Sequence, residues 1–356
     1  MPLPARDRLD GAHDLARAAP PLQPGDRVAI LSPSWAAPAH FPAIHEQALR
    51  RLRDEIGVEP VELPTTRRDS SAAERAADVN AAFADPSIRA IMSTIGGDDQ
   101  ITVLKHLDAD VIRANPKRFL GYSDNTNLLN YLWYHGIAGV YGGSTQVHLG
   151  PVPDEEHLAS LRAALFGGDF RLVAPARTRD VGIRWDDPRA LTDRAPNLPA
   201  EPWTWSGPRR TVTGPTWGGC LEIVEWTLAA NRWMRPVDDY RGAVLLLEPH
   251  EEMPTPDQNH RLLRNLGERG ILGSASAFLW GRPPVSDHEH PTTESAASKQ
   301  RAEHREVVLR AVAEYNPDLV VAMDVDFGHT SPQLLLPYGG SITVDGESQT
   351  ITAHFG

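Results

Sequence analysis

Short apolar runs and helical repeats alternate through the first 170 residues of the chain. Four apolar runs have the length of buried strands, at 27–32, 59–63, 90–94 and 118–121. The helical pattern covers 42–56, 71–84 and 125–134. Ser71 and Glu74 have the spacing of a capping box at the start of the second of these helices. This alternation predicts a parallel sheet with helices on both faces.

The pattern changes after residue 173. Residues 174–208 are rich in Pro, Arg and Asp and show no period, so we expect a linker or an excursion over the surface. Later strand-like runs are spaced less regularly, and helices are expected only at 256–269 and 294–315. The Asp-Gly pair at 345–346 predicts a C-terminal hairpin. The strand-like runs lie at 210–213, 243–247, 275–280, 319–325, 341–344 and 349–354.

These patterns predict an α/β fold with two domains. The first, residues 1–173, is an α/β domain built on a parallel sheet. Residues 174–208 form the linker, and residues 209–356 form a β-rich C-terminal domain.

The composition narrows the functional classes. The chain has 356 residues, is 41% hydrophobic and carries a formal net charge of −12. So acidic a surface repels phosphate backbones, and nucleic-acid binding is not expected. Residues 1–24 lack the pattern of a signal peptide, and no apolar run approaches the roughly 18 residues of a membrane helix. With Cys220 as the only cysteine, we expect a cytoplasmic protein with no membrane partner.

The segment 119–127 is the most informative for chemistry. An apolar run leads into Gly121 and then Ser123, and a helix is expected to begin near Asn125. A serine at such a strand-to-helix turn presents its hydroxyl at the carboxyl edge of the sheet, beside free helical N–H groups. The alternative is that Ser123 or Asp124 only caps the helix.

A second turn, Gly96-Gly97, follows another apolar run. Two glycines let the backbone approach a ligand and turn N–H groups towards it, which could supply an oxyanion donor. A plain tight turn is the alternative. The chain contains neither of the glycine-rich motifs that bind phosphate.

Glu248 and His329 each follow an apolar run. A carboxylate at a strand end can orient a histidine, and a histidine beside a glycine on a loop can act as a base. Either residue could instead be solvated. His288, His290 and His304 match no metal-binding spacing, and no metal site is expected.

In this order, the segments resemble the LD-carboxypeptidase family of serine peptidases, which includes the microcin C immunity protein. The matching pieces cover nearly the whole chain: the Gly96-Gly97 turn, 121–124, 217–222, 246–248, 281–283 and 327–330.

The resemblance implies a triad in which Ser123 is the nucleophile, His329 the base and Glu248 the acid that orients the base. It also implies an oxyanion hole made by the backbone N–H groups of Gly97 and Asp124. The active site would lie between the two domains, no metal or other cofactor would be needed, and the protein would be a homodimer.

Two branches of this family differ in substrate. One removes the terminal D-alanine from a cell-wall tetrapeptide, and the other cleaves an amide that links an aminoacyl group to a modified nucleotide. Trp203 and Trp205 favour the second branch, because one of them could stack on a nucleobase, although both could simply pack the loop. Gly96, Asp98 and Trp217 are further expected substrate contacts.

We therefore expect a serine carboxypeptidase or amidase that hydrolyses a peptidyl- or aminoacyl-nucleotide in detoxification or immunity. A muropeptide LD-carboxypeptidase of cell-wall recycling is the alternative. A non-catalytic ligand-binding protein on the same fold is more remote, because all three triad positions hold the required residue types.

Overall fold

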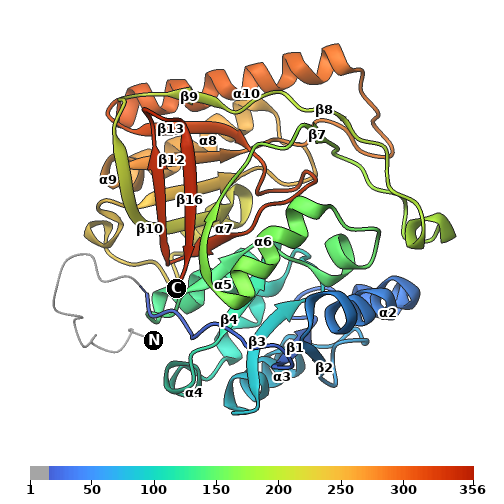
Figure 1. Ribbon diagram of the computed structural model, residues 1–356. Coiled ribbons are helices and arrows are strands. Elements are labelled where there is room, and N and C mark those ends of the chain that lie inside the picture. Colours follow the sequence, from blue (N-terminus) through green and yellow to red (C-terminus); the bar gives the residue numbers. More distant parts are fainter. Residues whose placement is uncertain (1–15) are drawn as a thin grey trace.

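The computed structural model describes residues 16–356, and the first half of this range supplies five strands of a six-stranded sheet (Figure 1). Five of its strands are parallel, in the order β5-β4-β3-β1-β2, and β14 pairs antiparallel with β5. The strands are Arg27–Leu31 (β1), Glu59–Glu62 (β2), Ile88–Ser93 (β3), Arg118–Gly121 (β4), Gly139–Tyr141 (β5) and Leu336–Tyr338 (β14).

Local sequence explains where the helices of this half begin and end. The Ser71 side chain accepts a hydrogen bond from the N–H of Glu74, and the Glu74 side chain accepts one from the N–H of Ser71. These two bonds complete the predicted capping box of α3. Gly57, in the left-handed region with φ +88°, ends the turn of π-helix that follows α2. The helices are Ala37–His40 (α1), Pro42–Arg51 (α2), Ala72–Ala84 (α3), Ala109–Ala114 (α4), Thr126–Tyr134 (α5) and Glu155–Phe166 (α6).

The second sheet has eight strands in the order β6-β16-β15-β10-β11-β12-β13-β9. The long strand β10 joins its two parts, pairing antiparallel with β15 over one half and parallel with β11 over the other. The strands are Gly168–Arg171 (β6), Thr204–Ser206 (β9), Thr211–Cys220 (β10), Val244–Glu248 (β11), Ala277–Gly281 (β12), Val320–Val325 (β13), Ser341–Asp345 (β15) and Thr350–Phe355 (β16).

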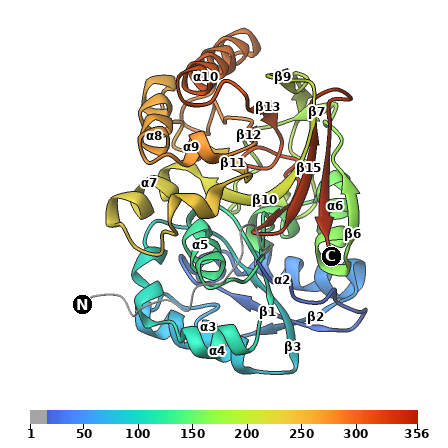
Figure 2. The ribbon, with the colours of Figure 1, turned by 90° about the vertical axis from the view of Figure 1, so that its left-hand side faces the viewer.

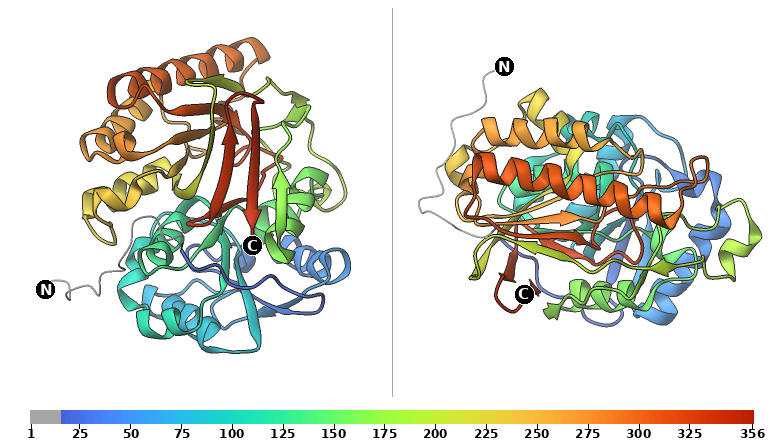
Figure 3. Two further views of the ribbon diagram at one scale, coloured as in Figure 1. Left: turned by 60° about the vertical axis from the view of Figure 1, so that its left-hand side comes forward. Right: turned by 90° about the horizontal axis from the view of Figure 1, so that it is seen from above.

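Helices pack on the face of the second sheet that is formed by its parallel strands, as Figure 2 shows. Viewed from above, α8 and α10 run side by side over these strands (Figure 3). Strands β11, β12 and β13 are buried along their whole length, which fits their uninterrupted apolar sequences. The helices are Leu221–Ala230 (α7), Pro256–Glu268 (α8), Ile271–Ser274 (α9) and Glu294–Tyr315 (α10).

The predicted fold class is confirmed, with one refinement of the C-terminal half. Its centre is a parallel βα arrangement, because the unpredicted helix α7 and helices α8 and α10 connect successive parallel strands. Across residues 16–356, no helix has both the length and the apolar character needed to cross a membrane.

The two halves exchange strands across the predicted boundaries. β6 lies before residue 173 but pairs with β16, whereas β14 lies after residue 209 but pairs with β5. The expected linker 174–208 contains β9, an edge strand on β13, and the short pair Arg177–Thr178 (β7) and Leu198–Pro199 (β8). The boundaries themselves stay a prediction, and residues 1–15 of the first range lie outside the described residues.

Candidate active site

Ser123 lies at the sharp turn between β4 and α5. It opens the short helix Ser123–Asn125 (η4) and has φ +60°, whereas the preceding Tyr122 is extended. A left-handed backbone is uncommon for a residue with a side chain, and such strain concentrates at functional turns. The turn matches the predicted strand-to-helix geometry of a nucleophile.

The Gly96-Gly97 turn packs directly against Ser123. A Cβ on Gly96 would lie 2.9 Å from the Cβ of Ser123 and 3.2 Å from the backbone nitrogen of Asp124, so only glycine fits without a shift. A Cβ on Gly97 would collide with the hydroxyl of Ser34. The close approach explains both glycines, and Asp98 is exposed at the end of the turn.

The carboxylate of Asp124 is buried and serves the structure of this turn. Its Oδ2 atom accepts hydrogen bonds from the Ser34 hydroxyl at 2.5 Å and the Gln100 N–H at 2.9 Å, and Oδ1 accepts one from the Asn127 amide at 2.8 Å. Burial raises the pKa of Asp124, and these donors oppose the rise. Its backbone N–H belongs to the first helical turn, where N–H groups have no partner inside the helix.

Glu248 and His329 form a hydrogen-bonded pair. The Nδ1–H group of His329 donates to Oε2 of Glu248 at 2.7 Å, and the Glu248 side chain is fully buried. Two glycines make room for this carboxylate. A Cβ on Gly328 would lie 2.5 Å from Oε2, and one on Gly281 would collide with the Cβ of Glu248. The pair fixes the imidazole so that Nε2 points away from Glu248 and is the nitrogen that could accept a proton.

Three neighbours set the properties of His329. Burial lowers the pKa of its imidazole, but the carboxylates of Glu248 and Glu251 outweigh burial and raise this pKa well above 6.5. The centroid of the Tyr122 ring lies 5.0 Å from that of the imidazole, which places the residue before Ser123 against the candidate base. Oε2 of Glu251 lies 2.9 Å from Nε2, at ion-pair distance but without the geometry of a hydrogen bond.

Tyr141, at the end of β5, was not predicted from the sequence. Its hydroxyl donates to Oε1 of Glu248 and lies beside the backbone N–H of Ser123. One phenol therefore joins the turn that carries Ser123, in the first sheet, to the carboxylate of Glu248 in the second. A strand-end tyrosine carries no local signal for this role. Glu251, on the loop after β11, was missed for the same reason.

Buried polar contacts hold the loop that carries His329. Asp326 accepts from Nε of Arg282 at 2.7 Å and from the indole N–H of Trp203 at 2.8 Å. On the other side of His329, the amide of Gln333 donates to Gly328 O and accepts from the N–H of Gly143, both at 2.8 Å. The motif 281–283 thus contributes a buried cation that fixes the histidine loop.

The three tryptophans expected at the substrate site have packing roles here. Trp203 binds Asp326 through its indole, and Trp205 lies on the edge strand β9 opposite Ala322. Both pack against the core. Trp217 is 2% exposed and donates its indole N–H to Asn130 at 3.0 Å, so it offers no surface to a substrate. Stacking of Trp203 or Trp205, which are both partly exposed, on a nucleobase stays a prediction.

A different aromatic group adjoins the Gly96-Gly97 turn. The backbone N–H of Trp35 donates to Gly96 O at 3.2 Å, and its ring is 38% exposed. The ring of Phe41 lies edge-on between it and Trp185, at 6.2 Å and 5.4 Å between centroids. Trp185 belongs to the excursion 174–208, which passes the end of the molecule that carries α2 (Figure 1). The sequence around Trp185 is polar and aperiodic, so it gave no reason to single out this residue.

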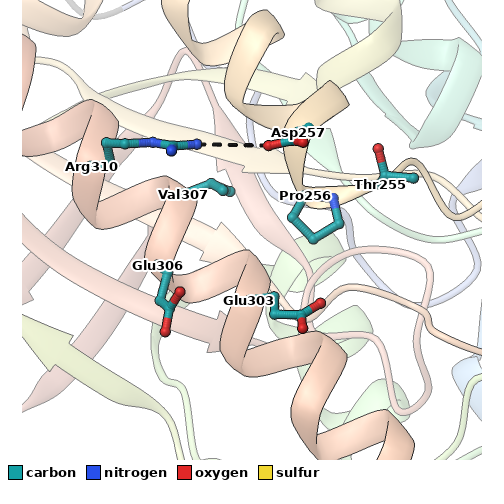
Figure 4. A pocket seen from close by; sticks show the side chains of 7 residues that line it. All are labelled: Thr255, Pro256, Asp257, Glu303, Glu306, Val307 and Arg310. Carbon is teal, nitrogen blue, oxygen red and sulfur yellow. Dashed lines mark ion pairs between the residues drawn. The ribbon is translucent and has the colours of Figure 1, made fainter.

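A separate hollow of about 460 Å³ lies between the start of α8 and the middle of α10, and it includes none of the candidate catalytic residues (Figure 4). Arg310 and Asp257 face each other across it at 3.9 Å. Among residues 16–356, no three His, Cys, Asp or Glu side chains gather into a group that could hold a metal ion. The hollow is lined by Thr255, Pro256, Asp257, Glu303, Glu306, Val307 and Arg310.

Comparison with known sequences decides the family. The LD-carboxypeptidase N-terminal domain matches residues 28–142, and the LD-carboxypeptidase C-terminal domain matches residues 213–344. The chain belongs to the LD-carboxypeptidase family. Membership in this family of serine peptidases supports hydrolase activity.

Relatives within the LD-carboxypeptidase family cover most of the chain. YocD of Bacillus subtilis, assigned as a carboxypeptidase, is 34% identical over 92% of this chain and 96% of its own. The microcin C7 self-immunity protein MccF of Escherichia coli is 28% identical over 80% of this chain and 79% of its own. The structure of MccF in complex with glutamyl sulfamoyl guanosine superposes with a TM-score of 0.80 at 24% identity, covering 94% of this chain and 98% of that one. The last comparison shows that the two-domain fold is shared.

Proposed function

We propose that the protein is a serine amidase in which Ser123, His329 and Glu248 form the catalytic triad. The observation that carries the proposal is the 2.7 Å hydrogen bond from His329 to the buried carboxylate of Glu248, beside a serine held in a strained turn. A buried carboxylate that fixes a histidine tautomer is the arrangement that serine hydrolases use. The contact of Tyr122 with His329 supports the pairing of nucleophile and base.

The mechanism follows from the placement of these groups. Ser123 Oγ attacks the amide carbonyl as Nε2 of His329 takes its proton, and Glu248 stabilises the imidazolium. The N–H groups of Gly97 and Asp124 stabilise the oxyanion, at about 3 kcal/mol each. The imidazolium then gives its proton to the leaving amine. Water attacks the acyl-enzyme, His329 acts as base again, and Ser123 is released.

We propose an aminoacyl- or peptidyl-nucleotide as the substrate. Two solved structures of MccF contain glutamyl sulfamoyl guanosine and aspartyl sulfamoyl adenosine, and a tryptophan-to-phenylalanine variant of MccF was solved with adenosine monophosphate. In this chain Trp35 lies beside the Gly96-Gly97 turn through its backbone N–H, and the ring of Phe41 separates the Trp35 ring from that of Trp185. Such rings stack on bases, and we favour these two tryptophans over Trp203 and Trp205, whose rings pack against the core, as the nucleobase contacts. Gly96 and Asp98 remain proposed substrate contacts on the turn.

The test is a comparison of two substrates. The purified protein is incubated with aspartyl-sulfamoyl-adenosine and with a muramyl tetrapeptide, and products are followed by mass spectrometry with Ser123→Ala as the control. We expect cleavage of the adenosine compound alone. Release of D-alanine alone would instead establish a cell-wall LD-carboxypeptidase. A protein that cleaves neither and whose Ser123 is inert to a fluorophosphonate would be a non-catalytic binder.

Cytoplasmic location and a homodimer, both expected from the sequence, are further parts of this proposal. Gel filtration coupled to light scattering measures the second. A mass of twice 39.1 kDa is the expected result, and a mass of 39.1 kDa would contradict it.

A further inference from the structure

The nitrogen of His329 that must accept the serine proton is already in contact with a carboxylate. Oε2 of Glu251 lies 2.9 Å from Nε2, and the proposed mechanism assigns no role to this residue. The His329 side chain is 5% exposed, so it is screened from water on its other sides. With Glu248 at Nδ1 and Glu251 at Nε2, the imidazole lies between two carboxylates.

Glu251 can leave this position without unfolding anything. It lies on the loop 249–255 between β11 and α8, and its side chain is 67% exposed. Contacts that do not involve the Glu251 side chain hold the loop backbone. The His250 N–H donates to the buried Glu222 at 3.3 Å, and within the loop the Met253 N–H donates to His250 O at 3.2 Å. Rotation of one side chain is enough to free Nε2.

The charges around His329 determine which kind of group could replace the imidazole as the partner of Glu251. Glu248 and Glu251 face His329 from β11 and the loop after it, Tyr122 faces it from the nucleophile turn, and His148 lies beyond Tyr122. Residues 249–255 contain two glutamates, neither Lys nor Arg, and one histidine, His250, which lies 3.8 Å from Glu222 and 4.0 Å from Glu252. A carboxylate that approaches along this loop is repelled, whereas a cation is attracted.

We infer that Glu251 is a specificity residue that caps Nε2 in the free enzyme and pairs with the α-ammonium group of the substrate during catalysis. This inference deepens the proposed function and rests on it. In an aminoacyl amide, the α-ammonium is attached to the carbon next to the scissile carbonyl, which must reach Ser123 beside Nε2. The ammonium exchanges places with the imidazolium as the partner of Glu251. His329 then releases its proton to water and becomes the base.

The inference selects one substrate class. An aminoacyl-nucleotide with a free amino terminus uncaps the base, whereas a peptidyl-nucleotide or an N-acylated analogue lacks the cation next to the scissile bond. The protein is therefore an aminoacyl-nucleotide amidase that discriminates against N-blocked substrates.

The experiment compares alanyl-sulfamoyl-adenosine with its N-acetyl derivative, so that no side-chain charge intervenes. Wild type, Glu251→Gln and Glu252→Gln are assayed for kcat/KM between pH 6 and 9. Glu252 is the matched control because it lies on the same loop, is 86% exposed and lies 4.0 Å from His250. Wild type and Glu252→Gln should prefer the free amine by about tenfold or more.

In Glu251→Gln this preference should fall towards one, because the N-acetyl compound is cleaved faster at neutral pH and the free amine more slowly. The acid limb of N-acetyl hydrolysis should also move to lower pH by about one pH unit, since a carboxylate that holds the proton of His329 is gone. An unchanged preference in Glu251→Gln, or no preference in wild type, overturns the inference.

A probe that needs no substrate separates this inference from the proposed function. The rate at which a fluorophosphonate labels Ser123 is measured at pH 7 in the same three proteins. Labelling about tenfold faster in Glu251→Gln supports the cap even if neither adenosine compound is cleaved, in which case only the proposed substrate fails. Equal labelling rates in wild type and Glu251→Gln overturn the cap.

Discussion

The hydroxyl of Tyr141 donates a hydrogen bond to the carboxylate of Glu248. Tyr141 ends β5 of the first sheet and Glu248 ends β11 of the second, so the bond crosses between the two sheets. Glu248 accepts from Tyr141 on one oxygen and from His329 on the other. The carboxylate that orients the proposed base is thus itself oriented by the sheet that carries the nucleophile.

Removal of this hydroxyl should weaken both catalysis and folding. Tyr141→Phe leaves one oxygen of the buried Glu248 without its donor, which should lower the free energy of unfolding by about 1–3 kcal/mol. We also expect kcat to fall about tenfold, because Glu248 holds His329 less firmly. Urea unfolding and steady-state kinetics measure the two effects. Tyr240→Phe is the control, since Tyr240 is buried but is at a distance from the triad among Trp133 and Trp217. A similar loss of kcat in both variants would contradict the assigned role.

Activity should be low in acid and rise into the alkaline range. Although burial opposes it, Glu248 and Glu251 raise the pKa of His329 well above 6.5, and only neutral His329 can take the proton of Ser123. An N-blocked substrate leaves Glu251 in contact with His329. For such a substrate the acid limb of kcat/KM should therefore lie above pH 6.5. The raised pKa also stabilises the folded protein fully below pH 6.5, and this contribution is lost as pH rises through the folded pKa. Accordingly, the stability difference between wild type and His329→Gln should shrink at high pH. An acid limb below pH 6 would show that the carboxylates do not raise the pKa of the base.

The Gly96-Gly97 turn should tolerate no side chain at its first position. In Gly96→Ala the added methyl meets Ser123 and Asp124 N at about 3 Å, so the proposed nucleophile or the proposed oxyanion donor must shift. A displacement of about 1 Å at the reacting groups costs about 100-fold in kcat. Gly182→Ala is the control because nothing lies within 4 Å of the added methyl. Equal kcat values for Gly96→Ala and wild type would show that the turn does not define the site.

Nucleotide binding should depend on Trp185 and be independent of Trp205. Trp185→Ala removes a ring beside Phe41 and should weaken binding of AMP by about 1–3 kcal/mol. Trp205→Ala removes a ring from the sheet edge and should leave AMP affinity unchanged. Isothermal titration calorimetry on both variants distinguishes them. If Trp205→Ala alone lost AMP binding, the nucleobase would have to lie at the sheet edge, opposite to the arrangement proposed here.

Strong local signals in the sequence predicted the elements well. The helix 294–315 and the strand 118–121 coincide with α10 and β4, and the capping box at Ser71 is present. Elements without such signals were missed. The six buried residues of helix α7 include Glu222 and Thr227, so polar and apolar positions do not separate into two faces, and the three-residue strand β14 pairs with the edge that β5 offers.

The candidate active site shows the same contrast between residues that a local sequence pattern marks and residues that it does not. Ser123 and His329 follow strands and Glu248 ends one, where the chain leaves the sheet at its carboxyl edge, and a residue pattern can indicate such positions. Tyr141, Glu251 and Trp185 gain their roles from segments distant in sequence, so no local pattern marks them. The hydrogen bond from the indole of Trp203 to Asp326 likewise could not be predicted from the polar loop that carries Trp203.

Mapping the reactive serine tests the central claim most directly. Wild type, Ser123→Ala, His329→Gln and Glu248→Gln are treated with a fluorophosphonate, and the label is located by mass spectrometry of tryptic peptides. The account predicts one label, on Ser123, that is absent in Ser123→Ala and forms more slowly by about 100-fold or more in His329→Gln, with Glu248→Gln also slowed. A label on another residue, or equal rates in wild type and His329→Gln, would contradict the proposed triad.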